Sequence, residues 1–138
     1  ETQLSYQPAA PERVMKAEVA AALKHALSMV VADGSARRLK GSFLNLDQTE
    51  MAIGGKTGTG DNKVATQVIR GKTVAATKVS RTATFVFYLG DNYFGTLTAF
   101  VPGKSAENFS FTSALPLQVL KGMAPLLTPY LQQPELCR

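Results

Sequence analysis

Cysteine is nearly absent from this chain, since the only one is Cys137, next to the C-terminal residue. An intrachain disulfide is therefore impossible, and cysteine usage says nothing about the redox compartment. No pair of cysteine or histidine residues has metal-ligand spacing, so we expect neither a metal nor another cofactor. Cys137 is expected to be a solvated thiol in a short tail, residues 134–138.

Long hydrophobic runs are absent too. No apolar stretch approaches the roughly 20 residues that a helix needs to span a bilayer, so any membrane anchor is expected outside these residues. The chain opens on Glu1, with no secretory signal segment, and we expect it to be processed or cut from something longer. Its 138 residues, 45% hydrophobic and 18% charged, suit one compact domain, residues 1–138.

Acidic residues are missing between Asn62 and Gly90, and this stretch holds five cations: Lys63, Arg70, Lys72, Lys78 and Arg81. Those charges equal the formal net charge of +5. They favour an anionic neighbour such as a carboxylate-bearing polymer, a phosphate or acidic lipid headgroups. Because no aromatic residue lies inside the basic run for base stacking, a solvated basic loop is favoured over a nucleic-acid partner.

The first third of the chain is predicted to be helical. Residues 1–13 read as an extended lead-in, and from Glu12 apolar residues recur at three- and four-residue steps, which predicts a helix with one face on a core. Gly34 is expected to stop this helix. The apolar face is predicted to consist of Val19, Leu23, Ala26, Leu27, Val30 and Val31.

The second half reads as sheet. Residues 82–89 and 93–101 are rich in β-branched and aromatic residues and flank Gly90-Asp91-Asn92, which predicts an antiparallel hairpin. Both faces of the first strand are partly apolar, so we expect cover on each side. A last helix is expected to begin at Ser113, with Pro116 in its first turn, and to be ended by Pro125 and Pro129. Its apolar face is predicted to consist of Leu117, Leu120, Met123 or Ala124, and Leu127. The fold class is therefore α+β, an antiparallel sheet packed against helices.

A short glycine-rich strand, residues 51–59, ends in Lys56-Thr57-Gly58-Thr59. Alternation places Lys56 and Gly58 on one face and the two threonines on the other, so a ligand in a groove on one side would not contact all four side chains equally. Gly58 leaves room for an extended peptide beside the strand. Lys56 and the threonine hydroxyls suit a substrate carboxylate, and a backbone N–H near the glycine suits an oxyanion in acyl transfer.

Simpler interpretations of single features stay open. A phosphate-binding loop fits Gly55-Lys56-Thr57 but fails where its first glycine is required, because Glu50 stands there. A flexible turn with an ordinary surface lysine is the plain alternative. His25 is expected at the surface. Asp61 orients the loop after the tetrad or, more simply, is a turn carboxylate. The methionines, expected to fill the core, are Met15, Met29, Met51 and Met123.

Several segments together make a family resemblance. Residues 27–37, 54–62, 81–87 and 96–103, with the helix from Ser113, resemble the C-terminal half of a penicillin-binding protein transpeptidase domain. These segments resemble those of class A proteins in particular, whose parent chains also carry a glycosyltransferase domain. Lys-Thr-Gly is one of three active-site elements of these serine enzymes. The other two are missing, because no serine begins S-x-x-K and no serine or tyrosine is followed two residues later by asparagine.

The resemblance implies a D-alanyl-D-alanine transpeptidase that crosslinks peptidoglycan stem peptides through a serine acyl-enzyme and is blocked by β-lactams. It implies that Lys56 and Thr57 orient a substrate or drug carboxylate, and that Thr59 supplies an oxyanion-hole N–H and a hydroxyl. The expected location is the periplasmic or extracytoplasmic face of a bacterial inner membrane. The chain departs from the family by lacking the nucleophile and by an insertion-like segment from Asn62 to Ser80.

This resemblance also implies a partial fold. In the family, two further strands from earlier sequence complete a five-stranded sheet, so strand 93–101 would have an open edge. We therefore expect the remainder of the domain, a dimer or a swapped arrangement to cover it. Two rival functions remain: a non-catalytic module that binds cell-envelope peptides or proteins through the same groove, and a basic surface-binding domain with a chance Lys-Thr-Gly.

Overall fold

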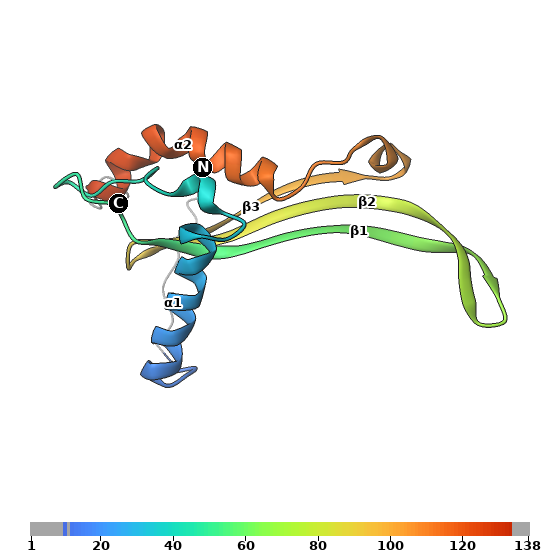
Figure 1. Cartoon of the computed structure of the whole chain (residues 1–138), viewed down its shortest axis with the longest axis horizontal. Helices are drawn as coiled ribbons and strands as arrows, with labels where there is room; N and C mark the ends of the chain where they lie inside the picture. Colours follow the sequence, from blue (N-terminus) through green and yellow to red (C-terminus); the bar gives the residue numbers. More distant parts are fainter. Residues whose placement is uncertain (1–9, 11, 134–138) are drawn as a thin grey trace, which may run out of the picture.

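The computed structural model describes residue 10 and residues 12–133, and it has the expected α+β architecture. One antiparallel sheet has the order β1-β2-β3 and packs against two helices (Figure 1). The elements are α1 (Ala17–Ala32), a 3-10 helix (Arg37–Leu39), β1 (Ile53–Ile69), β2 (Lys72–Leu89), β3 (Tyr93–Pro102), a second 3-10 helix (Lys104–Asn108) and α2 (Ala114–Gln132). Most of the expected lead-in, and the 134–138 tail with Cys137, lie outside the described residues.

The two helices lie on opposite sides of the sheet (Figure 1). α2 runs along one face, and the main core lies between α2 and this face. The largest fully buried side chains of the core are Phe43, Phe85, Leu39, Leu117 and Leu120. The Phe85 and Phe87 rings stack with centroids 5.5 Å apart. α1 approaches the other face, where the Tyr88 hydroxyl donates to the Lys24 carbonyl at 3.2 Å. The sheet is thus sandwiched only where α1 crosses it.

β2 is the central strand, and its antiparallel pairing with β3 confirms the predicted hairpin. Phe85 and Leu89 are buried on the α2 side, and the hairpin register pairs Leu89 with Tyr93. The expectation of cover on both faces is wrong for the described chain, because Val86, on the α1 side, is 54% exposed. The reason is that α1 contacts only one end of the sheet, which leaves the rest of that face open.

α1 begins at Ala17, five residues later than predicted, and ends before Gly34 as expected. The Gly34 N–H donates to the Met29 carbonyl at 3.1 Å, and a Cβ at this position would lie 2.8 Å from the Val30 oxygen. Only the C-terminal end of the predicted apolar face is covered: Val31 is buried, whereas Leu23 is 48% exposed. Exposed with it are Val19, Met15 and Met29, so the core-filling prediction holds for Met51 but is wrong for these two methionines.

α2 confirms the predicted apolar face, with Leu117, Leu120 and Ala124 buried. Ser113 is at the N-cap position, but its side chain makes no capping hydrogen bond. The prediction that prolines end the helix is wrong, because α2 runs through both Pro125 and Pro129 to Gln132. Leu127, between the two prolines, and Leu131, beyond both, pack against the core, and this burial offsets the backbone hydrogen bonds that the prolines remove.

The basic segment is not a loop, which corrects the sequence-based expectation. β1 and β2 continue as a two-stranded extension between Asn62 and Ser80, closed by Arg70 and Gly71. Both turn residues have positive φ, 50° and 75°, as a two-residue type I′ hairpin turn requires. Three register shifts interrupt the pairing. We call residues 63–79 the arm. Its irregular mixture of small, polar, basic and aliphatic residues carries no clean alternation, so the sequence alone did not reveal it.

The close approach of β1 to β2 gives a first prediction. A Cβ at Gly55 would meet the Val86 carbonyl oxygen and lie 2.7 Å from the Phe85 ring, so Gly55→Ala should force the backbone apart. We expect a loss of about 1–3 kcal/mol in the free energy of unfolding, measured by urea denaturation. Gly58→Ala on the same strand meets nothing within 4 Å and should change stability by about 0.5 kcal/mol or less. Equal losses in the two variants would refute this packing.

Candidate functional site

The tetrad lies on β1, an edge strand of the described sheet. The Gly90 N–H donates to the Ala52 carbonyl at 2.7 Å, so the main-chain groups of residue 52 face β2. No register shift occurs before Asn62, and main-chain direction alternates along a strand, so Thr57 and Thr59 direct their N–H and C=O groups away from β2. The strand predicted for residues 56–59 is confirmed, and the structure adds that this strand lies at an edge of the described sheet.

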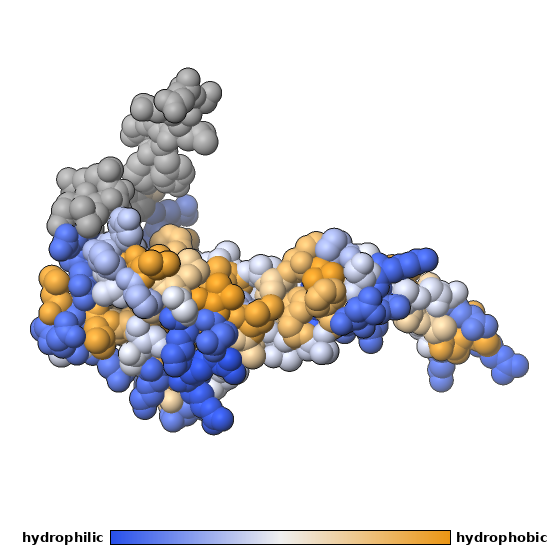
Figure 2. Space-filling view, turned by 90° about the horizontal axis from the view of Figure 1, so that it is seen from above, coloured by the Kyte–Doolittle hydropathy of each residue, from blue (hydrophilic) through white to orange (hydrophobic). Residues whose placement is uncertain are grey.

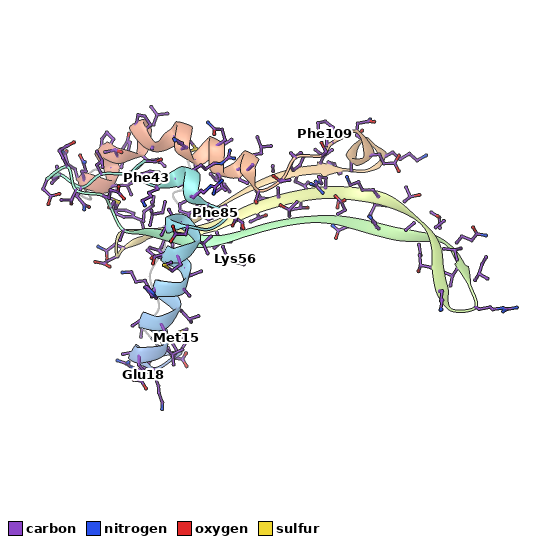
Figure 3. The ribbon with its side chains drawn as sticks, viewed as in Figure 1. Met15, Glu18, Phe43, Lys56, Phe85 and Phe109 are labelled. Atoms are coloured by element: carbon purple, nitrogen blue, oxygen red, sulfur yellow. The ribbon has the colours of Figure 1, made fainter. Side chains whose placement is uncertain are left out.

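The ammonium of Lys56 stays at this outer edge. Its Nζ donates to the Thr57 carbonyl oxygen at 2.6 Å, which is one of the outward-facing groups. Figure 3 shows Lys56 beside the junction of α1 with the sheet, on the side away from Phe43 and Phe85. The edge therefore presents a cation together with backbone donors. We call residues 56–59 of β1 the tetrad edge.

The two threonine hydroxyls lie on the other face. Thr57 Oγ1 is 2.7 Å from Ser35 Oγ, and Thr59 Oγ1 accepts the Ser113 backbone N–H at 2.9 Å. This confirms that the four side chains of the tetrad are not all accessible from one side of the sheet. Both hydroxyls already have protein partners, so the Lys56 ammonium and the backbone N–H groups are the groups left to meet a ligand. Ser35 and Ser113 were not assigned these contacts from sequence, because only folding brings them to β1.

The outer edge of β1 is unpaired, and the sheet face at its glycines is open. A Cβ built at Gly58 or Gly60 meets no heavy atom within 4 Å, and within the described part of the chain this stretch of β1 pairs only with β2. Free N–H and C=O groups on an accessible strand are the requirement for adding an extended peptide as a further strand. The geometry therefore suits a peptide that bears a carboxylate near Lys56.

An apolar depression adjoins the lysine. It is lined by Leu27 of α1 and, across the sheet, by Gly55, Lys56, Val86, Phe87 and Tyr88. A cation beside an apolar floor can hold a ligand with one charged group and small aliphatic side chains. This set includes no serine, threonine or cysteine, and the serine hydroxyl that contacts the tetrad, on Ser35, bonds a threonine rather than a base.

Asp61, two residues beyond the tetrad, pairs across the strands. Its Oδ1 lies 2.8 Å from Arg81 Nη1 and 3.2 Å from Lys78 Nζ, and these cations hold the pKa of the carboxyl below its usual value, Arg81 contributing most. Neither sequence interpretation of Asp61 was correct, because the residue lies within β1 rather than in a loop or turn. The sequence feature that could have indicated this ion pair was Arg81, 20 residues later, but the strand register has to be known before Arg81 can be placed opposite Asp61.

Arg81 extends this pair toward α2. Its Nε donates to the Phe111 carbonyl at 2.8 Å, Nη2 donates to the same oxygen, and the guanidinium lies 5.7 Å from the Phe111 ring centroid. Two residues later, the Ser113 N–H bonds Thr59 Oγ1. A continuous set of contacts therefore fastens residues 111–113, which lead into α2, to both ends of the segment from Thr59 to Asp61.

Acid should weaken this fastening, which is the second prediction. Because the folded pKa of Asp61 is lowered, its ion pair stabilises the fold fully above the unfolded value of about 3.9, and that stabilisation is lost as pH falls through the lower folded pKa. Asp61→Asn should therefore reduce unfolding free energy at neutral pH, and its difference from the wild type should shrink below about pH 4. Urea denaturation over a pH series measures this.

Asp91→Asn provides the matched comparison. Lys24 likewise lowers the pKa of Asp91, but the two side chains are 48% and 83% exposed, so solvent and salt screen the pair. We expect a smaller loss that added salt abolishes. An Asp61→Asn effect that does not vary with pH would contradict the assignment.

Other chemistry was tested against the geometry. Gly55-Lys56-Thr57 lies within an extended strand, not in a loop before a helix, so the phosphate-loop interpretation is excluded. His25 is exposed, as predicted. Over the described residues, no three His, Cys, Asp or Glu side chains come together as metal ligands would. Neither described helix combines the length and hydrophobicity of a membrane span.

Comparisons of this chain with protein-family models, with curated proteins and with solved structures found no match.

Proposed function

We propose that this chain is the C-terminal part of a peptidoglycan D,D-transpeptidase domain of the penicillin-binding type. The tetrad edge forms one wall of a site in which a serine from another segment is acylated by a stem peptide ending in D-alanyl-D-alanine. Lys56 holds the terminal carboxylate, and the outward N–H of Thr59 donates to the oxyanion. The parent enzyme works on the extracytoplasmic face of the inner membrane and is blocked by β-lactams; this chain alone is inactive.

The observation that carries the proposal is the position of the tetrad on an open strand edge. Lys56 Nζ is at that edge, and the main-chain alternation fixed at Ala52 directs the N–H of Thr59 outward. An oxyanion needs preorganised donors and a substrate carboxylate needs a nearby cation, and both are here within one strand. A surface lysine in a flexible turn would offer neither arrangement.

The uncovered surfaces support a partial domain. On the α1 side of the sheet Val86 is 54%, Phe94 88% and Phe100 57% exposed, and α1 presents Leu23 toward solvent as well. Several large apolar side chains exposed on one face of a sheet are typical of an interface. The remainder of the transpeptidase domain, with its serine and lysine, is the partner that we propose for this face, next to the Lys56 depression.

The β3 edge supports the same conclusion. β3 pairs with β2 along residues 93–102 and, within the described chain, with no other strand. Open edges recruit further strands, so the isolated chain is proposed to dimerise or swap through β3 when the rest of the domain is missing. Light scattering over a concentration series tests this: a monomer at every concentration would contradict it.

A non-catalytic peptide-binding module is the second candidate. It is favoured by one observation, the contact of Ser35 with Thr57 rather than with a lysine or histidine, which leaves the described tetrad edge without a nucleophile. Such a module would use the same cation and N–H groups to bind stem peptides or envelope proteins with no covalent step.

Binding of a peptide to the isotopically labelled chain tests the shared edge. A short peptide ending in D-alanyl-D-alanine should shift the amide resonances of Thr57 and Thr59, and the same peptide amidated at its C-terminus should shift them less. A Lys56→Ala chain should lose the difference. Resonance shifts spread over basic residues of the arm, and unaffected by Lys56→Ala, would instead identify a basic surface-binding domain.

A further inference from the structure

The arm stands away from the rest of the molecule. Figure 1 shows β1 and β2 running on beyond the helices and β3 and then bending at the tip. The tip is the two-residue turn of Arg70 and Gly71, and the residues around it are exposed on both strands. A protruding tip can reach a flat surface without a clash from the body, whereas it offers no concave site to a small molecule.

Free positive charge lies along the arm, with Arg70 and Lys72 at its tip and Lys63 opposite Lys78 at its base. Lys63, Arg70 and Lys72 are exposed, and none forms an ion pair with a described acidic residue. Lys78, opposite Lys63, is different, because it pairs with Asp61 and donates to the Phe109 carbonyl at 3.2 Å, so its charge is already paired. No acidic residue occurs between Asn62 and Gly90 to offset the three free cations.

Aliphatic side chains lie among these cations. Four are about half exposed: Val64 at 54%, Val68 at 57%, Ile69 at 51% and Val74 at 53%. Val68 and Ile69 are adjacent in one strand, so they point to opposite faces of the ribbon. Figure 2 shows hydrophobic and hydrophilic residues side by side along the arm to its end. The arm therefore exposes apolar side chains on both faces, with cations at its tip and at its base.

We propose that the arm tip binds the surface of an anionic lipid bilayer. The aliphatic side chains enter the headgroup region, and Lys63, Arg70 and Lys72 contact acidic headgroups. A protein partner would cover one face of the ribbon and leave the other apolar face in water. A polyanion would satisfy the cations but not the aliphatic residues. Only a medium that surrounds the tip meets both.

Pairing with a second copy through the arm is disfavoured by its construction. Its three register shifts disturb the ladder, and bulges of this kind twist an edge away from further strands. Lysines along both strands add repulsion between two copies. The proposal does not depend on the transpeptidase assignment, because it concerns residues outside the tetrad edge.

Co-sedimentation of the whole chain with lipid vesicles tests the proposal. The chain should bind vesicles that contain phosphatidylglycerol, and should bind phosphatidylcholine vesicles far less. Lys63→Gln with Arg70→Gln and Lys72→Gln should weaken binding about a hundredfold, because each cation near an anionic surface contributes about a fivefold effect. The control neutralises three exposed body cations instead, Arg37, Lys104 and Lys121, and should retain most of the binding.

Insertion of the tip is tested by fluorescence, since the chain contains no tryptophan. The emission of Val68→Trp should shift to the blue with anionic vesicles, whereas that of Leu126→Trp, at an exposed position on α2, should not. Equal losses in the two charge variants, or no blue shift at residue 68, would overturn the proposal. Retention on immobilised polyglutamate without vesicle binding would overturn it in favour of an acidic polymer.

Discussion

Phe85→Ala is expected to remove most of the stability of the chain. Phe85 is fully buried between β2 and α2, in one cluster with Leu117 and Leu120, and stacks on Phe87. Truncating a buried phenylalanine costs about 3–5 kcal/mol, while small domains have about 5–15 kcal/mol in total. Urea denaturation followed by circular dichroism should show a large fall in the midpoint, or an unfolded chain without urea.

Phe94→Ala is the matched control for this prediction. It makes the same substitution on the neighbouring strand, where Phe94 is 88% exposed and faces the α1 side. Its cost should be about 0.5 kcal/mol or less. Similar losses at the two positions would mean that the core does not lie between the sheet and α2.

Lys56→Ala is expected to abolish most acylation of the proposed parent enzyme by a β-lactam. Its Nζ, at the open edge beside Thr57, is the tetrad's only side-chain cation for the drug carboxylate. Loss of one preorganised donor in comparable acyl-transfer sites slows the reaction about a hundredfold or more, and we expect a similar fall in the acylation rate constant. Stopped-flow or quenched-flow labelling with a fluorescent penicillin measures it.

Lys63→Ala controls for the loss of a positive charge. Lys63 is exposed on the same strand, seven positions further on, where the arm begins. Its removal should leave the acylation rate within about twofold, because an exposed charge at that distance is largely screened by salt. A comparable loss in both variants would show that general charge, not the tetrad edge, attracts the drug.

Local patterns predicted the elements that are defined by their own residues. The hairpin around Gly90, the stop of α1 at Gly34 and the buried face of α2 each follow from turn chemistry or spacing within a few residues. The prediction that the prolines end α2 was wrong because their local cost is outweighed by the packing of Leu127, between them, and Leu131, beyond both. The arm was missed because its pairing depends on a turn with an unusual residue, Arg70, at positive φ.

The site was predictable only in part, for a similar reason. Alternation gave the opposite faces of Lys56 and Thr57, since that depends on the strand alone. The edge position of β1, the Ser35 and Ser113 contacts and the Asp61 ion pair depend on residues about 20 or more positions away along the chain. Sequence spacing carries no direct information about such contacts until the register is known.

Intact-mass spectrometry after exposure to a labelled penicillin tests the central claim most directly. The two samples are this chain and the longer protein that is proposed to contain it. We expect one adduct on the longer protein, at a serine outside residues 1–138, and no adduct on this chain; the longer protein with Lys56→Ala should be labelled much more slowly. No adduct on the longer protein would contradict a transpeptidase and leave the non-catalytic peptide-binding module.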